Sequence, residues 1–357
     1  MNAGEERALP RVCAMAVYFE PLPPWFGLWA ASCVRNSGID FLVVTDQESD
    51  ALPVNVRALS ETLDGVKGRL EVVLRCKVAL SRLYKLCDYE PFLGLVFADE
   101  LTGYDYWGFA DLDLVFGDLE GFFREQDLWR HDKFLPLGHP FLFRNASEVN
   151  VRVELPAHGE ELWRRVVDSD ENQALDEFGI NEIYVEHVFP AHMGRSTADI
   201  TIALWHFTLG IRFDMRDGGC QASMLHRYPN YKRQVFYWRD GRAGWLALDH
   251  GEMVVGLFLY AHFQKWRFTK EMVRVKPGDD FYFDSEGFML MAGLDAGAAF
   301  EVVNPHGTFV EMPRGCSSMP RGFSVRQGWR SSVATMSWHA NQGSTDFARL
   351  RLAGDAL

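Results

Sequence analysis

The sequence lacks several features that would place it in a familiar class of protein. Its 357 residues carry a formal net charge of −13, whereas a protein that binds nucleic acid through its overall charge needs a basic field. No run of about 18 apolar residues is present, so we expect no transmembrane helix. The first residues, 1–19, include acidic side chains and no long apolar segment, which argues against a signal peptide. We therefore expect a cytoplasmic protein without a nucleic-acid partner, although this charge still allows a local basic groove.

The sequence is also poor in motifs for zinc, nucleotides and nucleophiles. None of its six cysteines forms a CxxC pair, which argues against a zinc knuckle and favours reduced thiols in a core. The P-loop GxxxxGK[ST], the dinucleotide-binding GxGxxG, the metalloprotease HExxH and the nucleophile elbow GxSxG are all missing. These absences weigh against proteases, esterases, kinases and dehydrogenases.

What is present begins with alternating apolar segments. Residues 11–19 form a short β-prone run, residues 25–36 are apolar on all sides, and residues 39–46 form a second β-prone run. This strand–loop–helix–strand order is the signature of a parallel sheet and predicts an α/β fold. Further along, the patterns predict helices over 68–89, 159–170 and 171–189, strands over 104–111, 201–214 and 253–266, mixed strand and loop over 133–145, and a hairpin over 233–249.

The texture of the sequence changes after residue 270. Glycine, serine and short hydrophobic pieces dominate there, and no strong helical period survives. We therefore predict two units: an α/β domain over residues 1–270 and a small β-rich appendage over residues 271–357.

Two carboxylates follow the strand predicted over 104–111. The stretch reads "YDYWGFADLDLVFGD", with Asp111 and Asp113 one residue apart. In open α/β sheets, ligands bind at the carboxyl ends of the strands. Paired carboxylates there repel each other unless a cation lies between them, and Mg²⁺ or Mn²⁺ takes such oxygen ligands together with substrate phosphates. On spacing alone, however, a strand-end turn with solvated or helix-capping carboxylates is the favoured interpretation.

The wider sequence resembles a bacterial family of glycosyltransferase-like proteins found in polysaccharide-synthesis gene clusters. Five stretches carry the resemblance in the family's order and cover about residues 11–268: "VYFEPLPPWFGLWAASCVRNSGIDFLVVTD", "YKLCDYEPFLG", "YDYWGFADLDLVFGDL", "GHPFLFRN" and "FLYAHFQKW". The chain departs from the pattern at Leu83, where proline is common, and at Ala110, where a more polar residue is expected. The resemblance implies a GT-A-like fold, a mixed and mainly parallel sheet flanked by helices that binds a nucleotide sugar.

The resemblance also implies a metal site beneath the diphosphate of the nucleotide sugar. Asp111 and Asp113 would hold Mn²⁺ or Mg²⁺, with Asp113 as the favoured direct ligand. His262, in "YAHFQKW", would be a late third ligand, and imidazole suits Mn²⁺ better than Mg²⁺. Lys265 would meet the diphosphate as a point charge. From the residues alone, His262 fits a core histidine equally well, and Lys265 fits a solvated lysine.

Residues for the nucleotide follow from the same resemblance. Tyr18 and Phe19 would flank the base, and Asp46 would accept hydrogen bonds from the base or ribose. Lys85 and Asp88 would reach the nucleotide or its phosphates. The ordinary alternatives are core packing for the two aromatic residues, a turn cap for Asp46 and a surface ion pair on a helix for Lys85 and Asp88.

The acceptor side is expected in two segments. His139, Arg144 and Asn145 in "GHPFLFRN" suit a loop near the sugar. An inverting transferase needs a carboxylate base, for which Asp176 and Glu177 are the candidates. The alternative for these two acids is the solvated face of a helix. We also expect a mobile loop over residues 118–126.

Taken together, these features predict a metal-dependent glycosyltransferase. It would move a sugar from a nucleoside diphosphate sugar, UDP- or GDP-linked, to a hydroxyl of a glycan, lipid-linked glycan or small metabolite. Lipid-linked acceptors leave peripheral membrane contact open. One alternative is a nucleotidyltransferase that cleaves at the α-phosphate, although the acidic, proline-rich "EPLPPWFG" stands where a basic glycine-rich loop is expected. The other is a non-catalytic sugar- or protein-binding module on the same fold.

Overall fold

A computed structural model describes most of the first 263 residues and a few strands beyond them. The described residues are 8–48, 52–135, 139–192, 197–201, 208–209, 234–239, 241–249, 252–263, 281–283, 288–290 and 347–350.

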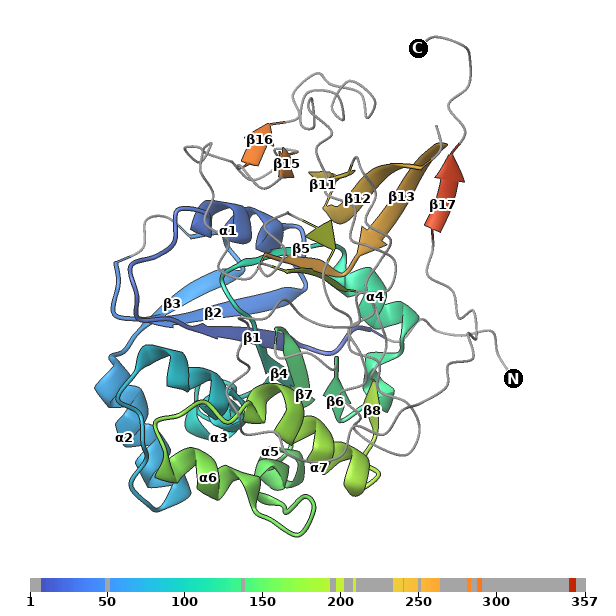
Figure 1. Cartoon of the computed structure of the whole chain (residues 1–357). Coiled ribbons are helices and arrows are strands. Elements are labelled where there is room, and N and C mark those ends of the chain that lie inside the picture. The colour runs from blue at the N-terminus through green and yellow to red at the C-terminus, as the bar shows by residue number, and fades with distance from the viewer. Residues whose placement is uncertain are drawn as a thin grey trace, which may run out of the picture.

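A seven-stranded sheet forms the centre of the molecule (Figure 1). Four neighbouring strands run parallel, and the antiparallel β7 extends the sheet beside β4. The expected α/β class is confirmed as a mixed, mainly parallel sheet flanked by helices. In spatial order the strands are β3 (Val56–Ser60), β2 (Ile39–Thr45), β1 (Val12–Val17), β4 (Tyr106–Phe109), β7 (Phe141–Arg144), β6 (Lys133–Phe134) and β8 (Ala191–His192).

Alternating side chains of the buried strands feed two hydrophobic cores, one on each face of this sheet. In β1, Cys13 and Met15 join one core, whereas Val12, Ala14 and Ala16 join the other. The helices over the first core are α2 (Leu63–Leu74), η1 (Leu83–Phe92), α3 (Leu93–Val96), α5 (Ser147–Asn150), η3 (Val151–Glu154), α6 (Leu162–Asp168), η4 (Leu175–Gly179) and α7 (Ile180–Glu186). The helices over the second core are α1 (Phe26–Val34), α4 (Leu119–Glu125) and η2 (Leu128–Arg130).

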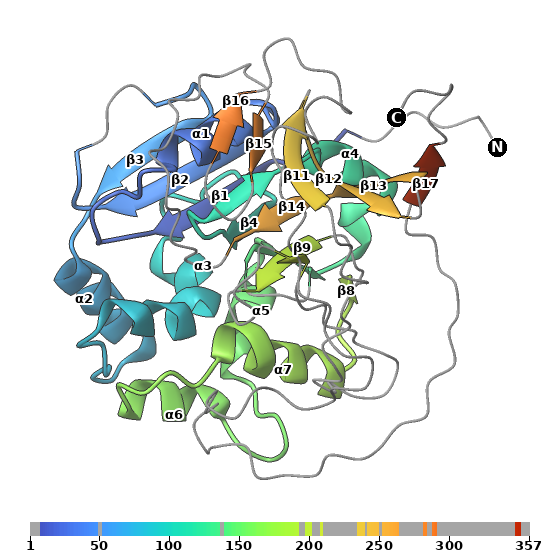
Figure 2. The ribbon, with the colours of Figure 1, turned by 45° about the horizontal axis from the view of Figure 1, so that its top comes forward.

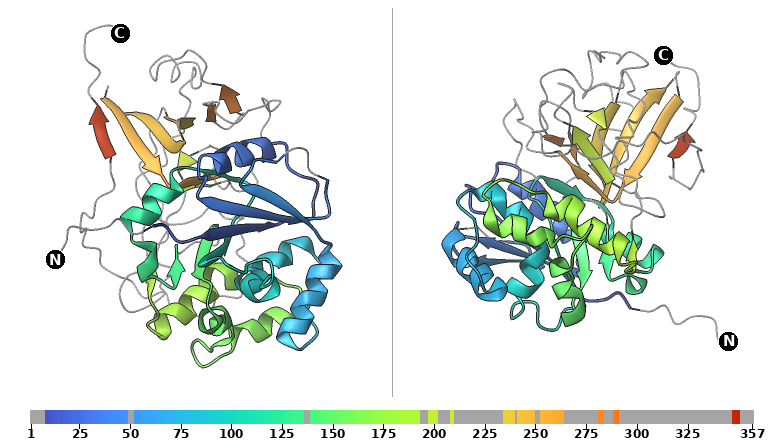
Figure 3. Two further views of the ribbon diagram at one scale, coloured as in Figure 1. Left: turned by 180° about the vertical axis from the view of Figure 1, so that it is seen from behind. Right: turned by 60° about the horizontal axis from the view of Figure 1, so that its bottom comes forward.

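Two further sheets lie on the α1 side of the central sheet (Figures 2 and 3). A four-stranded sheet has the order β10 (Thr208–Leu209), β9 (Thr197–Thr201), β14 (Tyr260–His262), β5 (Leu114–Phe116). A six-stranded antiparallel sheet has the order β16 (Phe288–Leu290), β15 (Phe281–Phe283), β11 (Gln234–Arg239), β12 (Arg242–Asp249), β13 (Glu252–Phe258), β17 (Phe347–Leu350). Strands from both sides of residue 270 therefore share one sheet. The division into two units, residues 1–270 and 271–357, stays a prediction.

Several predicted elements are confirmed, and two are wrong. The strands and helix at the start of the chain and the β11–β12 hairpin are present. The helix expected over 68–89 is interrupted: α2 ends at Leu74, Arg75 is left-handed with φ of 54°, and Ala79 donates its amide to the carbonyl of Val167 at 2.8 Å. The loop expected over 118–126 is instead the helix α4, because Asp118 caps it by accepting from the Gly121 amide at 2.8 Å.

Among the described residues, no helix combines the length and the apolar character needed to cross a membrane.

Candidate functional site

Strand pairing brings three metal-ligating side chains together at the carboxyl end of β4. Asp111 follows β4. A hydrogen bond from the Ala110 amide to the Met15 carbonyl, at 2.8 Å, continues the pairing of β4 with β1 as far as Ala110. Asp113 directly precedes β5, and His262 ends β14. Because β5 and β14 pair antiparallel, His262 lies opposite Leu114, next to Asp113. Two residues of one turn thus meet a residue about 150 positions later in the chain.

The turn between the two aspartates is held from both sides. Leu112 is buried in the core, so that the flanking carboxylates leave the turn on its other side. The indole Nε1 of Trp25 donates to the Leu112 carbonyl at 3.0 Å, and the Phe263 amide donates to the Asp113 carbonyl at 3.1 Å. The Trp25 and Phe263 rings pack edge to face with centroids 5.6 Å apart. The turn is therefore fixed by backbone contacts that do not involve the carboxylates.

The spacing of the three side chains fits a divalent cation. His262 Nε2 lies 3.3 Å from Asp113 Oδ1 and 4.0 Å from Asp111 Oδ2, and one ligand atom from each residue lies within 4.8 Å of the others. With metal–ligand bonds of about 2.1 Å, ligand atoms at right angles lie about 3 Å apart and opposite ones about 4.2 Å. Among the described residues, this is the one such group of three. Asp111 is 40% exposed, against 12% for Asp113, so Asp111 faces solvent.

His139 lies against His262, the candidate metal ligand. Its ring centroid is 3.6 Å from that of His262, and both side chains are buried. The residue reaches this edge because β7 begins at Phe141, opposite Phe109 at the end of β4. The structure therefore brings His139, expected near the sugar, into contact with a candidate metal ligand.

Arg144 and Asn145 lie at the opposite edge of the sheet and do not join this site. Arg144 stands opposite Tyr106, at the start of β4, and its guanidinium Nε pairs with Asp132 at 2.9 Å. The side-chain amide of Asn145 donates to the carbonyls of Leu101 and Tyr104, both at 3.0 Å. The antiparallel direction of β7 explains this, since it carries the end of "GHPFLFRN" away from the site.

The residues expected around the nucleotide base follow the first two strands. Tyr18 and Phe19 come directly after β1 and are half-buried. Burial raises the pKa of Tyr18 to about 12, and the charges of Glu20 and then of Asp113 act in the same direction. Asp46 is exposed after β2 and accepts from the Gln47 side chain at 2.5 Å. The carboxyl ends of β1, β2 and β4 thus present Tyr18, Phe19, Asp46 and Asp111 along one edge.

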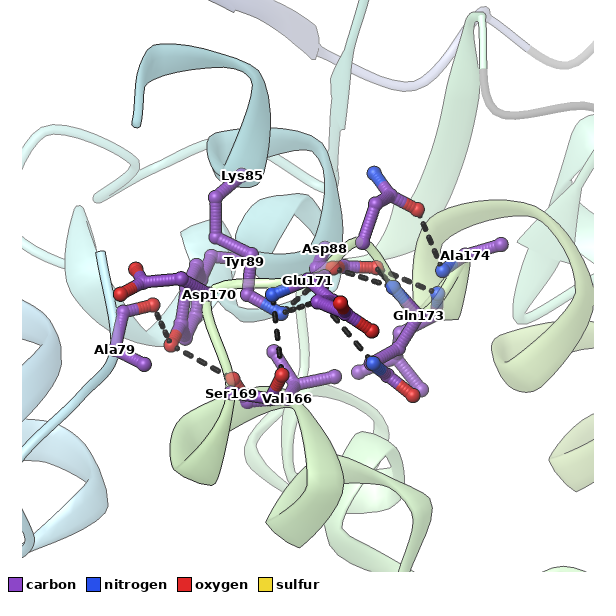
Figure 4. A network of polar contacts seen from close by, with 12 residues as sticks. Ala79, Lys85, Asp88, Tyr89, Val166, Ser169, Asp170, Glu171, Gln173 and Ala174 are labelled. Carbon is purple, nitrogen blue, oxygen red and sulfur yellow. Dashed lines mark hydrogen bonds and ion pairs between the residues drawn. The ribbon is translucent and has the colours of Figure 1, made fainter. Parts of the chain in front are cut away.

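Lys85 and Asp88 do not reach the nucleotide edge, so their predicted contact with the nucleotide is corrected. Their side chains are 1% and 0% exposed and form an ion pair of 2.9 Å. Lys85 Nζ also donates to the Glu171 carbonyl at 2.7 Å. Both side chains turn inward to the segment that precedes η4 (Figure 4). They are therefore no surface ion pair either.

Asp176 and Glu177 lie in the π-helical turn η4, which leads into α7. Asp176 is 8% exposed, and its Oδ1 has no hydrogen-bond partner among the described residues. Burial raises the pKa of Asp176 well above its usual range, and the charges of Glu177, Asp88 and Asp111 act in the same direction. The predicted solvated helix face is therefore wrong for Asp176. Lys265 lies outside the described residues.

Two residues of η1, Glu90 and Tyr84, lie near these acidic residues and were not among the predicted site residues. Burial raises the pKa of Glu90 well above its usual range, and negative charges add to this, in falling order those of Asp111, Asp176, Glu177 and Asp88. The pKa of Tyr84 is also raised, first by desolvation of its phenol and then by Cys87, Asp176, Glu177 and Asp111. Both belong to "YKLCDYEPFLG", so that stretch was the signal available in the sequence.

Comparison with known proteins adds a family but no activity. No curated protein matches the chain. Among solved structures, it is similar to the apo-form glycosyltransferase GlyE in Streptococcus pneumoniae TIGR4, at 14% sequence identity and a TM-score of 0.27, over 51% of this chain and 45% of that chain. A TM-score this low identifies neither the fold nor the activity. A family model matches residues 14–291, which include every candidate site residue, and the chain therefore belongs to the "Family of unknown function (DUF6625)".

Proposed function

We propose that this protein is a metal-dependent glycosyltransferase that moves a sugar from a nucleoside diphosphate sugar to a hydroxyl acceptor. The observation that carries the proposal is the convergence of Asp111, Asp113 and His262 at the carboxyl end of β4. This is the edge at which α/β sheets bind ligands, and a carboxylate pair beside a histidine suits Mn²⁺ or Mg²⁺.

The residues at this edge divide the work of holding the donor. Asp113 and His262 are the more buried ligands, while Asp111 is 40% exposed and would be open to the diphosphate. A bound divalent cation would neutralise the charge that develops on the leaving diphosphate. Tyr18 and Phe19 lie after β1, where their rings would flank the base, and Asp46 would accept hydrogen bonds from the base or ribose.

Asp176 is the better of the two candidates for the base. A general base must have a free oxygen and a pKa near the working pH. Asp176 Oδ1 has no hydrogen-bond partner among the described residues, and burial raises the pKa of this carboxyl. In a transfer that inverts the anomeric centre, Asp176 would take the proton of the acceptor hydroxyl as its oxygen attacks. Glu177, half-buried beside it, is the second candidate.

Metal-dependent nucleotide binding is the direct test. We would measure the unfolding temperature with UDP, GDP, CDP and dTDP, each with and without Mn²⁺, for the wild type and for Asp113→Ala. A ligand that binds only the native state must raise this temperature. The proposal expects a rise with one nucleotide that needs Mn²⁺ and is lost in the variant.

Each remaining outcome points to another function. No rise with any nucleotide would overturn the proposal and leave the binding-module alternative. A metal-dependent rise combined with release of inorganic diphosphate from a nucleoside triphosphate would favour the nucleotidyltransferase. Release of the nucleoside diphosphate from a sugar donor, with transfer to an added acceptor, is the result expected of a glycosyltransferase.

A further inference from the structure

A short segment without regular hydrogen bonding, residues 169–174, leads into the turn that carries Asp176 and Glu177. It is tied to η1 and the residues before it by polar contacts (Figure 4). Asp170 accepts from the Ser81 amide at 2.8 Å, at the outer end of the segment. Lys85 and Asp88 make the contacts at its inner end, next to η4.

Asp88 binds the backbone on both sides of Ala174. Its Oδ1 accepts from the amides of Gln173 and Leu175, each at 3.1 Å, and its Oδ2 accepts from the Gln173 amide at 2.8 Å. Lys85 Nζ donates to Asp88 Oδ2 at 2.9 Å and to the Glu171 carbonyl at 2.7 Å. The two side chains therefore fix the backbone at residues 171, 173 and 175, the last of which adjoins Asp176.

The residue between these contacts has a conformation that needs support. Ala174 is left-handed, with φ of 53° and ψ of 42°, a conformation that is unfavourable for a residue other than glycine. Its carbonyl accepts from the amides of Phe178 and Gly179 at 3.0 and 3.2 Å and so opens the π-helical turn. Contacts on both sides of Ala174 therefore set the direction in which η4 begins.

We propose that the buried Lys85–Asp88 ion pair is a positioning device, which fixes the start of η4 and with it the place of Asp176 and Glu177. This inference rests on the proposed function. Two charges removed from water are costly, and apolar side chains of similar size often stabilise a core as well or better. Here the pair supplies acceptors and a donor to three backbone positions, which an apolar pair cannot do. Neither residue touches the substrate, so both are positioning residues.

The charge of Asp88 gives the device a second effect that can be measured. Together with burial and Glu177, it raises the pKa of Asp176. Removal of this charge therefore lowers the pH at which the base loses its proton. The acidic limb of the kcat profile would move to lower pH, which a purely structural defect would not cause.

The test compares Asp88→Asn and Lys85→Met with Asn55→Ala, a control from the opposite edge of the sheet. Asn55 is likewise a buried polar side chain that binds backbone groups. Its Nδ2 donates to the carbonyls of Cys33, Asn36 and Ile39, at 2.8, 3.1 and 3.0 Å. Below the unfolding temperature of every variant, we would measure kcat, the donor KM and the half-saturating Mn²⁺ concentration. We expect kcat to fall about a hundredfold in Asp88→Asn, because a misplacement of about 1 Å costs that much.

The order of the effects distinguishes positioning from lost stability. Lys85→Met leaves Asp88 able to accept from both amides, so its loss of kcat is smaller, and Asn55→Ala keeps kcat. The donor KM and the Mn²⁺ dependence stay near wild type in all three. Equal kcat values in Asp88→Asn and wild type, with an unshifted acidic limb, would overturn the inference. So would losses of kcat that follow stability and include Asn55→Ala.

Hydrogen exchange separates failure of this inference from failure of the proposed function. The amides of Gln173 and Leu175 should exchange faster in Asp88→Ala, which removes both acceptor oxygens, than in Asn55→Ala, whether or not sugar transfer is found. Unchanged exchange at these amides overturns the tether itself. Faster exchange in a protein whose wild type shows no metal-dependent nucleotide binding refutes the glycosyltransferase, and with it the positioning of a base.

Discussion

The two halves of the site are built in different ways. The metal half stands on strands, where the β4, β5 and β14 backbones bring Asp111, Asp113 and His262 together. The other half, the tethered half, rests on η1 and η4. Here the buried ion pair of Lys85 and Asp88, on η1, holds the backbone at the start of η4. When one side chain is lost, the backbone of a strand-based site keeps its shape, because hydrogen bonds between the strands hold it. The backbone of a tethered turn depends on the side chains that anchor it. Carboxyl groups gather in the tethered half, where burial and the neighbouring acids raise the pKa values of Glu90 and Asp176 well above their usual range.

Loss of a metal ligand should have the largest effect. Asp113→Ala removes the less exposed of the two carboxylates, which lies 3.3 Å from His262, while the backbone of the turn keeps its contacts with Trp25 and Phe263. We expect a loss of transfer of at least about a hundredfold, since charge on the leaving diphosphate is no longer neutralised. Folding should be little changed. Transfer assays and thermal unfolding with and without Mn²⁺ would check this.

The control for that variant is Asp127→Asn, which removes a carboxylate paired with Arg130 on the surface. It should retain both transfer and the Mn²⁺ effect. A fully active Asp113→Ala would contradict the metal site and leave the two aspartates as a strand-end turn.

Loss of the base should separate the two halves of the site. Asp176→Asn keeps the shape of the side chain but cannot take a proton, so we expect kcat to fall by about 10²–10⁴-fold. Nucleotide binding with Mn²⁺ should persist, because Asp176 lies outside the group of metal ligands. Measurement of kcat beside nucleotide affinity would show the split. An active Asp176→Asn together with an inactive Glu177→Gln would move the base to Glu177.

Sequence patterns predicted the strand-based half of the site better than the tethered half. The β1–α1–β2 order and the strand before Asp111 follow from local periodicity, and the D-x-D spacing follows from the sequence itself. Tertiary contacts decided the rest. The spacing of Lys85 and Asp88 predicts an ion pair, but only the segment 86 residues later, at Glu171, buries it. Likewise, only the antiparallel direction of β7 separates Arg144 from His139.

His139 offers a smaller perturbation of the metal half. Its ring contacts that of His262, tilted by 37° with centroids 3.6 Å apart, and so restricts the orientation of that ligand. We expect His139→Ala to weaken Mn²⁺ binding about tenfold, in the range found when residues behind metal ligands are removed. Titration of the Mn²⁺ dependence of nucleotide binding would measure this. The control is His131→Ala, which removes a ring that packs against Phe134 and His192. Equal weakening of Mn²⁺ binding in both variants would argue against a role of the His139 ring in orienting His262.

The smallest expected effect concerns stability and pH in the tethered half. The Asp176 pKa is raised in the folded protein, so above the unfolded value of about 3.9 the unfolded chain releases its proton first. The native state then binds more protons, and its stability falls as pH rises towards the folded pKa of Asp176. Removal of this group should therefore stabilise the protein at neutral pH, by about 1 kcal/mol.

Asp176→Asn should accordingly unfold at a higher temperature than wild type at pH 7, and the gain should vanish well below the unfolded pKa of about 3.9, where the carboxyl is protonated in both states. Thermal unfolding of the metal-free protein across this pH range would measure the gain. A gain that is independent of pH would instead indicate better packing of the amide. A loss of stability at pH 7 would mean that the Asp176 carboxylate is stabilised in the fold, contrary to its burial beside Glu177, Asp88 and Asp111. The same carboxylate would then be too weak a base for the proposed transfer.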